Sequence, residues 1–271
     1  MRKMRCSTRL ALVPVIFLLP LVAAAQTTGD APVTSGSDRL FLAFAEDATV
    51  VGGQWWEGQL EYADWDVVDA MILRGVAAFQ PWERWELGAR IGFGDTDASG
   101  PRSDGSGATD LDVWGKYHLG QTGDATEFAL GGLATVPTGD DAAGLGYDSF
   151  AVEGFGSLRH RFPEWILSVQ AGVRFNGDGQ IFAGEGQVDL DGKTSPVVGL
   201  GAIYPVSDQV SLVAEARFEG ERFDGGDSDV RALGGVNWRG FNRGMIRGAV
   251  SVGLADGAPD VQLLAGYAVS F

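Results

Sequence analysis

The last stretch of the chain, residues 261–271 (VQLLAGYAVSF), constrains the fold more than any other. Because successive side chains of a β-strand point to opposite faces, one face of this stretch carries only apolar residues. That face consists of Val261, Leu263, Ala265, Tyr267, Val269 and Phe271. The other face is small or weakly polar, and the sequence stops on the aromatic residue. We therefore expect a final β-strand whose apolar face meets lipid.

The first 25 residues show the three parts of a secretory signal peptide. Residues 1–9 carry four basic side chains and no acid, residues 10–22 are an apolar run, and residues 23–25 are three alanines that offer a cleavage site. A membrane-spanning helix needs about 20 apolar residues, whereas this run is shorter and contains two prolines. The sequence therefore predicts export, with a mature chain that begins near Gln26.

Taken together, the two ends predict where the protein goes. The ending at 261–271 resembles the C-terminal sorting signal of bacterial outer-membrane β-barrels. Cys6 precedes the apolar run, so a lipoprotein anchor is not expected. We expect a protein of the outer membrane, surrounded by lipid and lipopolysaccharide, with the barrel-assembly machinery as a partner through residues 261–271.

Composition excludes several classes. The predicted leader holds four of the 20 basic residues and none of the 36 acidic ones, which leaves 16 basic residues against 36 acidic. Nucleic-acid phosphates would repel so acidic a chain, so no nucleic-acid partner is expected. Beyond the leader there is no cysteine, which argues against a disulfide framework or thiol chemistry. The 41 glycines favour short strands over membrane-spanning helices.

From Gln54 onward, apolar and polar residues alternate with a period of two, which indicates β-strands. Twelve such segments are predicted, at residues 54–62, 69–79, 85–94, 111–119, 128–136, 150–159, 165–175, 198–204, 210–218, 230–238, 246–252 and 261–271. Short turns, such as 80–84, alternate with longer or acidic links at 95–109, 137–147, 176–195 and 219–227. Outer-membrane barrels show this asymmetry. Residues 54–271 are therefore predicted to form an all-β, antiparallel, up-and-down transmembrane barrel of about 12 strands, within a range of roughly 10–14.

A water-soluble β-sandwich would show the same period with its apolar face inside. The predicted leader, the terminal aromatic residue and aromatic residues at strand ends decide for the barrel, since aromatic girdles mark membrane interfaces. The strand-end aromatic residues are Phe79, Trp85, Trp165, Tyr204 and Trp238.

Residues 26–53 form a leader that precedes the barrel. Residues 26–37 are rich in Thr, Ser, Gly and Pro and are expected to be disordered. The stretch from Arg39 to Val51 is apolar but alternates poorly. We expect it either on the periplasmic side or in the barrel mouth, where it would act as a plug.

Two short motifs suggest a family. Residues 109–117 (TDLDVWGKY) and 134–140 (ATVPTGD) resemble the outer-membrane family described for the MetA pathway of phenol degradation. The resemblance extends over roughly residues 55–271. It implies a channel or uptake protein for small, often aromatic or apolar compounds, and it implies no particular substrate-binding residues.

In the predicted barrel, charged side chains lie on the face opposite the apolar one and therefore point into the lumen. They are Glu61, Arg74, Glu86, Arg90, Asp112, Lys116, Glu153, Arg159, Arg174, Glu215, Arg217, Arg231 and Arg247. One interpretation is a polar filling in which acids and bases pair, because unpaired buried charges are costly. The other is a charged constriction that selects solutes. The sequence favours the filling, and the two interpretations are compatible.

Other functions fit less well. An outer-membrane lipase needs a Ser and a His within hydrogen-bond reach, and His118 and His160 lie at strand ends away from a suitable serine. Aspartate pairs in the loops could bridge divalent cations weakly, but their spacing matches no calcium loop. We expect a channel that passes a small solute, apolar or aromatic in character, through a narrow charged lumen. It would need no catalytic residue, metal or cofactor. The alternative is a closed or plugged barrel with a structural or interaction role.

Overall fold

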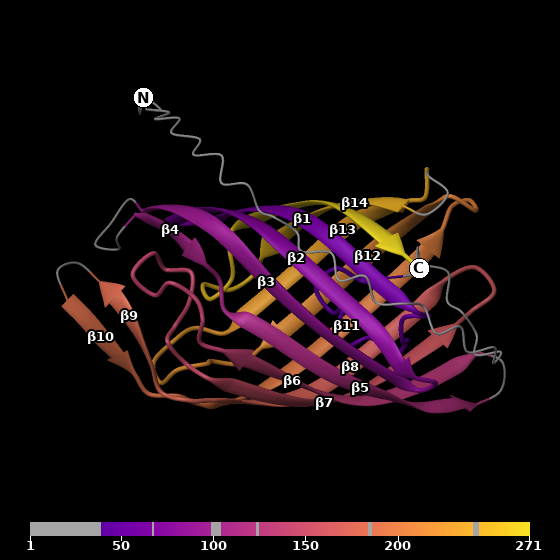
Figure 1. Ribbon diagram of the computed structural model, residues 1–271, viewed down its shortest axis with the longest axis horizontal. Helices are drawn as coiled ribbons and strands as arrows, with labels where there is room; N and C mark the ends of the chain where they lie inside the picture. The colour runs from indigo at the N-terminus through magenta and orange to yellow at the C-terminus, as the bar shows by residue number, and fades with distance from the viewer. Residues whose placement is uncertain (1–38, 67, 99–103, 123–124, 184–185, 241–243) are drawn as a thin grey trace. The chain divides into compact units, whose positions relative to one another are not determined.

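The computed structural model describes residues 39–66, 68–98, 104–122, 125–183, 186–240 and 244–271 (Figure 1). The predicted signal peptide, residues 1–25, and residues 26–38 of the leader lie outside the described residues. All described residues belong to one compact unit, residues 31–271. No helix in the described part of the chain has the length and apolar character needed to cross a membrane.

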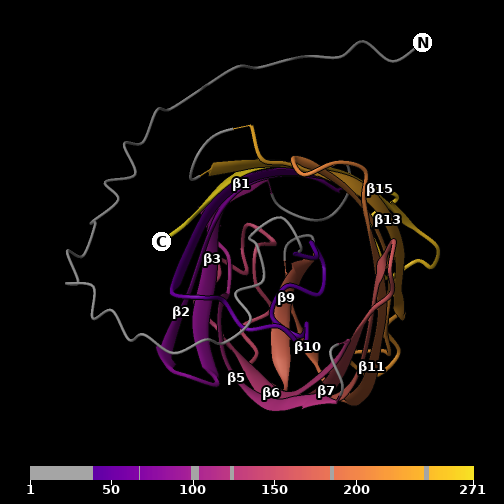
Figure 2. The same cartoon turned by 90° about the vertical axis from the view of Figure 1, so that its right-hand side faces the viewer.

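Twelve of the strands in the described chain close into an antiparallel barrel, which confirms the predicted fold. They are β1 (Gln54–Trp65), β2 (Val68–Trp82), β3 (Trp85–Ala98), β5 (Leu111–Thr122), β6 (Thr126–Val136), β7 (Ala151–Arg161), β8 (Ile166–Asn176), β11 (Thr194–Pro205), β12 (Val210–Glu219), β13 (Asp229–Trp238), β14 (Gly244–Gly253) and β15 (Val261–Ser270). Each wall strand pairs with the next one, and β1 also pairs with β15, which closes the ring (Figure 2). A closed ring leaves no unpaired strand edge, which is the condition for crossing a bilayer with strands.

Alternating side chains give the barrel wall two different faces. On β12, Leu212 and Ala214 are exposed on the outside, whereas Val213 and Glu215 are buried inside. Every wall strand exposes at least one large apolar residue. In water, such surface costs about 25 cal/mol per Å². The outer face of the barrel is therefore suited to lipid.

The two ends of the barrel differ in their connections. One end, the turn end, carries the β2–β3, β5–β6, β7–β8, β11–β12 and β13–β14 connections, and the other, the loop end, carries the remaining ones. The strand seam closes at the turn end, where Gln54 and Phe271 each donate a backbone N–H to the other's carbonyl at 3.0 Å. The predicted girdle residues Phe79, Trp85, Trp165, Tyr204 and Trp238 are all exposed. All five lie near the turn end, so they form a girdle at one membrane interface.

Several predicted loops and turns are wrong, because the strands extend further than their apolar pattern. β3 continues to Ala98, and its residues 93–96 pair with β4 (Gly105–Ala108), although 95–109 is predicted to be a link between strands. The expected loop at 176–195 contains the hairpin of β9 (Gly179–Ala183) and β10 (Gly186–Leu190) and the start of β11. Residues 80–82 belong to β2, so the expected turn at 80–84 is reduced to residues 83–84. Backbone pairing needs no apolar face, so polar strand ends carry no period-two signal.

We expect Gly53→Ala to weaken the closing seam. Gly53 has a φ of +93°, and a methyl group added there would overlap the carbonyl oxygen of Phe271. Strain of this kind costs about 1–3 kcal/mol, which should lower the temperature at which the barrel unfolds on heat-modifiability gels. Gly58→Ala is the matched control, because nothing lies within 4 Å of a methyl group added on that residue. Equal unfolding temperatures for the two variants would contradict the prediction.

Candidate functional site

Residues Arg39–Val51, here called the inner segment, lie inside the ring of strands (Figure 2). All of them are buried except Leu42 and Val50, which are partly buried. None belongs to a strand of the barrel wall. The inner segment is therefore held by its side chains and its backbone polar groups, not by the strand ladder.

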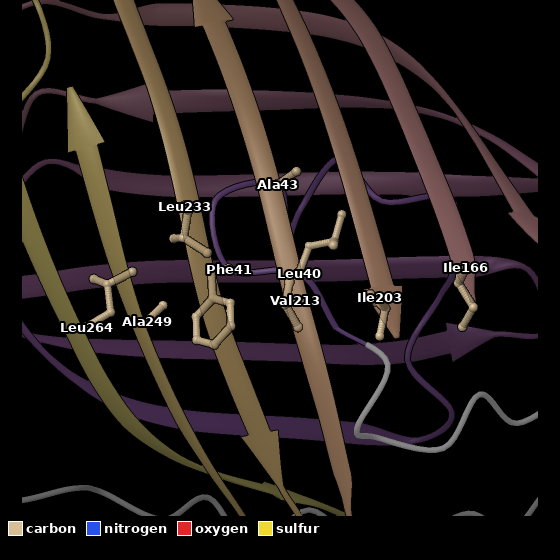
Figure 3. Packing of buried hydrophobic residues seen from close by; sticks show 9 residues of the cluster. All are labelled: Leu40, Phe41, Ala43, Ile166, Ile203, Val213, Leu233, Ala249 and Leu264. Carbon is tan, nitrogen blue, oxygen red and sulfur yellow. The ribbon is translucent and has the colours of Figure 1, made fainter. Parts of the chain in front are cut away.

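Apolar contacts join the inner segment to the wall through two clusters. In the first, Leu40, Phe41 and Ala43 pack against side chains from β8, β11, β12, β13, β14 and β15 (Figure 3). These wall residues are Ile166, Ile203, Val213, Leu233, Ala249 and Leu264. In the second, Phe44, Ala45 and Val51 pack against Trp55, Ala78, Trp114, Leu133, Met245 and Ala268. Apolar side chains from many wall strands therefore pack against the inner segment.

Aromatic rings dominate the second cluster. The Phe44 ring lies 5.7 Å from the ring of Trp55 and 6.0 Å from that of Trp114, edge-on to the latter. The Arg39 guanidinium lies 5.1 Å from the centre of the Phe44 ring. Edge-to-face ring pairs contribute about 0.5–1.5 kcal/mol beyond the stabilisation that burial of their surface provides.

The acidic residues of the inner segment bind basic residues of the wall. Asp47 lies 2.5 Å from Nη1 of Arg159 and accepts a hydrogen bond from Ser168 Oγ at 2.8 Å. Burial by itself would raise the pKa of Asp47. The charges of Arg159, Lys116 and Arg39, together with the Ser168 hydrogen bond, outweigh burial and hold that pKa below its ordinary value. Asp47 therefore remains a carboxylate at neutral pH.

Two wall carboxylates bind the backbone of the inner segment. Glu215 accepts hydrogen bonds from three consecutive N–H groups, those of Phe41 (2.5 Å), Leu42 (3.0 Å) and Ala43 (3.1 Å). Successive N–H groups of this kind form a concave anion site. Glu86 accepts the Val51 N–H at 2.7 Å. The inner segment is therefore bound near both of its ends.

Three further polar side chains lie around the Glu86 carboxylate. It accepts the indole N–H of Trp114 at 3.0 Å, lies 3.2 Å from Nζ of Lys116 and lies 3.5 Å from Nη2 of Arg39. Both Glu86 and Lys116 are fully buried. Breaking such a buried pair leaves an uncompensated charge, which is strongly destabilising.

Arg247 on β14 binds the start of the inner segment. Its guanidinium donates to the carbonyl oxygens of Leu40 (2.6 Å) and Arg39 (3.2 Å) and pairs with Glu57 at 2.6 Å. The same guanidinium lies 4.2 Å from the centre of the Phe41 ring. Arg247 thus combines an ion pair, two hydrogen bonds and a cation–π contact.

The thirteen charged residues that the sequence assigns to the lumen divide into two groups. Five bind the inner segment directly, namely Glu86, Arg159, Glu215, Arg217 and Arg247, and Lys116 joins them through Glu86. The other seven, Glu61, Arg74, Arg90, Asp112, Glu153, Arg174 and Arg231, lie nearer the loop end and interact with other residues of the wall.

Wall pairs follow one another around the lumen. Arg74 lies 3.0 Å from Glu61, and Arg90 lies 2.7 Å from Asp112. Arg174 lies 3.8 Å from Glu153. Each of these acids therefore lies beside a base on the neighbouring strand, as a polar filling requires.

Sequence reasoning missed residues that complete the site. Arg39, Glu46 and Asp47 bind wall charges, yet they lie in a stretch without strand periodicity. Glu57 lies on the inner face of β1, four residues before Glu61, so the period of two could have identified it. Glu219, expected to begin an acidic loop, instead ends β12 and is buried.

Each of the two histidines has a polar neighbour that is not a serine. His118 Nε2 lies 3.6 Å from Glu127, and His160 Nδ1 lies 2.7 Å from the hydroxyl of Thr126. Within the described ranges, no group of three or more His, Cys, Asp or Glu side chains is arranged to hold a metal ion.

No protein-family model and no curated protein matches the sequence. Solved structures do match. An outer membrane channel from Pseudomonas putida F1 superposes with a TM-score of 0.68 at 19% identity, covering 83% of this chain and 97% of that one. This chain has the outer-membrane β-barrel fold. The NanC porin (TM-score 0.55, 9% identity, 80% and 98% coverage) and the KdgM porin in complex with disordered oligogalacturonate (0.54, 8%, 80% and 99%) share it.

At these identities the likeness establishes the fold alone. No family model supports the resemblance to the phenol-degradation family, so this resemblance stays a prediction.

Proposed function

We propose that the protein is an outer-membrane channel for a small solute and that its inner segment is a plug. The observation that carries this proposal is the location of Arg39–Val51 in the lumen without any strand pairing to the wall. Because no ladder bond holds it, the inner segment could leave while every wall strand keeps both neighbours. A closed barrel whose inner segment can leave the lumen would act as a gated channel.

The side chains along the lumen favour a solute with both apolar and polar parts. Toward the loop end a solute would meet paired charges such as Arg74–Glu61 and Arg90–Asp112. Toward the turn end, departure of the inner segment would uncover apolar side chains such as Trp114, beside the charged groups of Glu215 and Arg247. We therefore propose a small compound of apolar or aromatic character, in agreement with what the family resemblance implies.

A closed barrel with a structural or interaction role is the second candidate. Buried ion pairs, among them Asp47–Arg159 and Glu46–Arg217, favour it because they hold the inner segment firmly. Under this alternative the inner segment would be a permanent part of the core. The electrical behaviour of the barrel separates the two candidates.

Ion selectivity tests the proposed path. We expect Arg174→Ala to shift the reversal potential of the current toward cations, because it removes a positive charge that lies between Glu153 and Glu219 (3.8 and 3.7 Å). Reversal potentials in planar bilayers under a salt gradient measure this shift. Arg84→Ala is the matched control, because Arg84 is exposed at the β2–β3 turn. Equal reversal potentials for both variants would contradict a path past Arg174.

A further inference from the structure

Glu153 on β7 is a buried carboxylate without hydrogen bonds. It is 1% exposed, and neither of its oxygens has a hydrogen-bond donor. The nearest cations are Nη1 of Arg174 at 3.8 Å and Nη2 of Arg217 at 3.9 Å, both measured to Oε2. A carboxylate in this position is costly, since it has lost water and gained no donor in return.

Glu46 of the inner segment is close to the same guanidinium. Its Oε1 lies 2.7 Å from Nη1 of Arg217, whereas its Oε2 is buried without a donor. Glu46 is also 1% exposed. One guanidinium therefore lies between a carboxylate of the inner segment and a carboxylate of the wall, and three of their four oxygens lack a donor.

The remaining charges around the pair are engaged elsewhere. Glu219 on β12 binds Arg222 through both oxygens, at 2.7 and 3.1 Å. Arg174 on β8 donates to Thr135 (2.8 Å) and Asn176 (3.2 Å). Beyond them, Arg90 on β3 pairs with Asp112 on β5. Of the carboxylates in this cluster, Glu153 therefore has the weakest contacts with the surrounding guanidiniums.

We propose that Glu153 holds a proton while the inner segment, with Glu46, is in the lumen, and that losing this proton loosens the inner segment. Protonation of Glu153 removes the buried charge that no donor stabilises. Deprotonation leaves two like charges on either side of Arg217, one on the inner segment and one on the wall. This proposal rests on the plug function proposed above.

The direction of the pH effect follows from proton counting. The plugged state holds one proton more than the released state, in which both carboxylates meet water. Low pH therefore favours the plugged state, and release rises by up to about tenfold for each pH unit above the pKa of Glu153 in the plugged state.

The test is the pH dependence of open probability for the full-length protein in planar bilayers between about pH 5 and 9. We expect the parent protein to open more as pH rises. Glu153→Gln should remove that rise, because the amide remains neutral and supplies an N–H donor. Glu164→Gln is the matched control and should keep the slope, since Glu164 is exposed in the β7–β8 turn of the same hairpin as Glu153.

A second variant keeps the test valid if Glu153→Gln fails to fold. Glu46 is outside the wall, so Glu46→Gln leaves every strand unchanged and should also flatten the pH profile. A parent protein without pH dependence, or a Glu153→Gln variant that keeps the parent slope, would overturn the proposed protonation of Glu153. Removal of residues 39–51 without any change in conductance would instead overturn the plug itself, so the two failures can be distinguished.

Discussion

Removal of residues 39–51 is expected to turn a mostly closed barrel into a steadily conducting one. Those residues fill the lumen near the turn end, and their loss leaves the wall intact because β1 begins only at Gln54. The wall carboxylate Glu215 and the guanidiniums of Arg159 and Arg247 would then be hydrated, so ions could pass. Single-channel recording of parent and deletion variant should show a rise in mean conductance of roughly tenfold or more, the size expected when a minor open state becomes dominant.

Controls make the outcome interpretable. Both proteins should migrate as heat-modifiable barrels, which shows that the wall has formed. A folded deletion variant that stays electrically silent would argue against the channel and for the structural role.

The conducting variant also serves to test the solute class. Benzyl alcohol, which has an aromatic ring, should block its current more strongly than glycerol at equal concentration, because the exposed lining includes Trp55 and Trp114. Equal block by the two alcohols would count against a solute of aromatic character.

The barrel wall could be predicted from the sequence because alternation is a local property. On β12, Leu212 and Ala214 face outward and Val213 and Glu215 inward, and this order can be read from consecutive residues without any knowledge of the partner strand. The β4 strand could not be predicted in this way. Its sequence, GSGA, has no apolar face, and only its backbone pairs with β3.

The candidate site was less accessible to sequence reasoning because its contacts join distant parts of the chain. The carbonyl of Leu40 accepts a hydrogen bond from Arg247, 207 positions later, and the carboxylate of Glu215 binds the N–H of Phe41, 174 positions earlier. No periodicity specifies such pairs. The sequence could identify inward-facing charges such as Glu86, but not which of them would bind the inner segment.

Substitution of Asp47 is expected to release the inner segment. Asp47 and Arg159 are almost completely buried and lie 2.5 Å apart, so Asp47→Ala removes the carboxylate from a buried guanidinium. Removing one partner of a buried pair costs about 3–5 kcal/mol, or roughly two to four powers of ten in the release equilibrium. Because water has access to the lumen, we expect the cost of Asp47→Ala to lie near the lower end of this range.

Thiol labelling can measure this release. A cysteine in place of Ala48, which is 0% exposed, should react slowly with a maleimide in the parent and much faster with Asp47→Ala. Asp208→Ala is the control, because Asp208 is exposed in the β11–β12 turn. Labelling of the Asp47 variant at the parent rate would contradict the assigned role of the pair.

A double-mutant cycle then tests whether the pair itself is responsible. Arg159→Ala alone leaves Asp47 buried beside Ser168 without its closest guanidinium, so it should also accelerate labelling. The double variant buries neither charge and should label more slowly than the two single effects would predict when added together. Strict additivity would mean that Asp47 and Arg159 act independently. A coupling of about 1–3 kcal/mol would show that this ion pair keeps the inner segment in the lumen. A solute or partner that opens the channel would then have to break this contact.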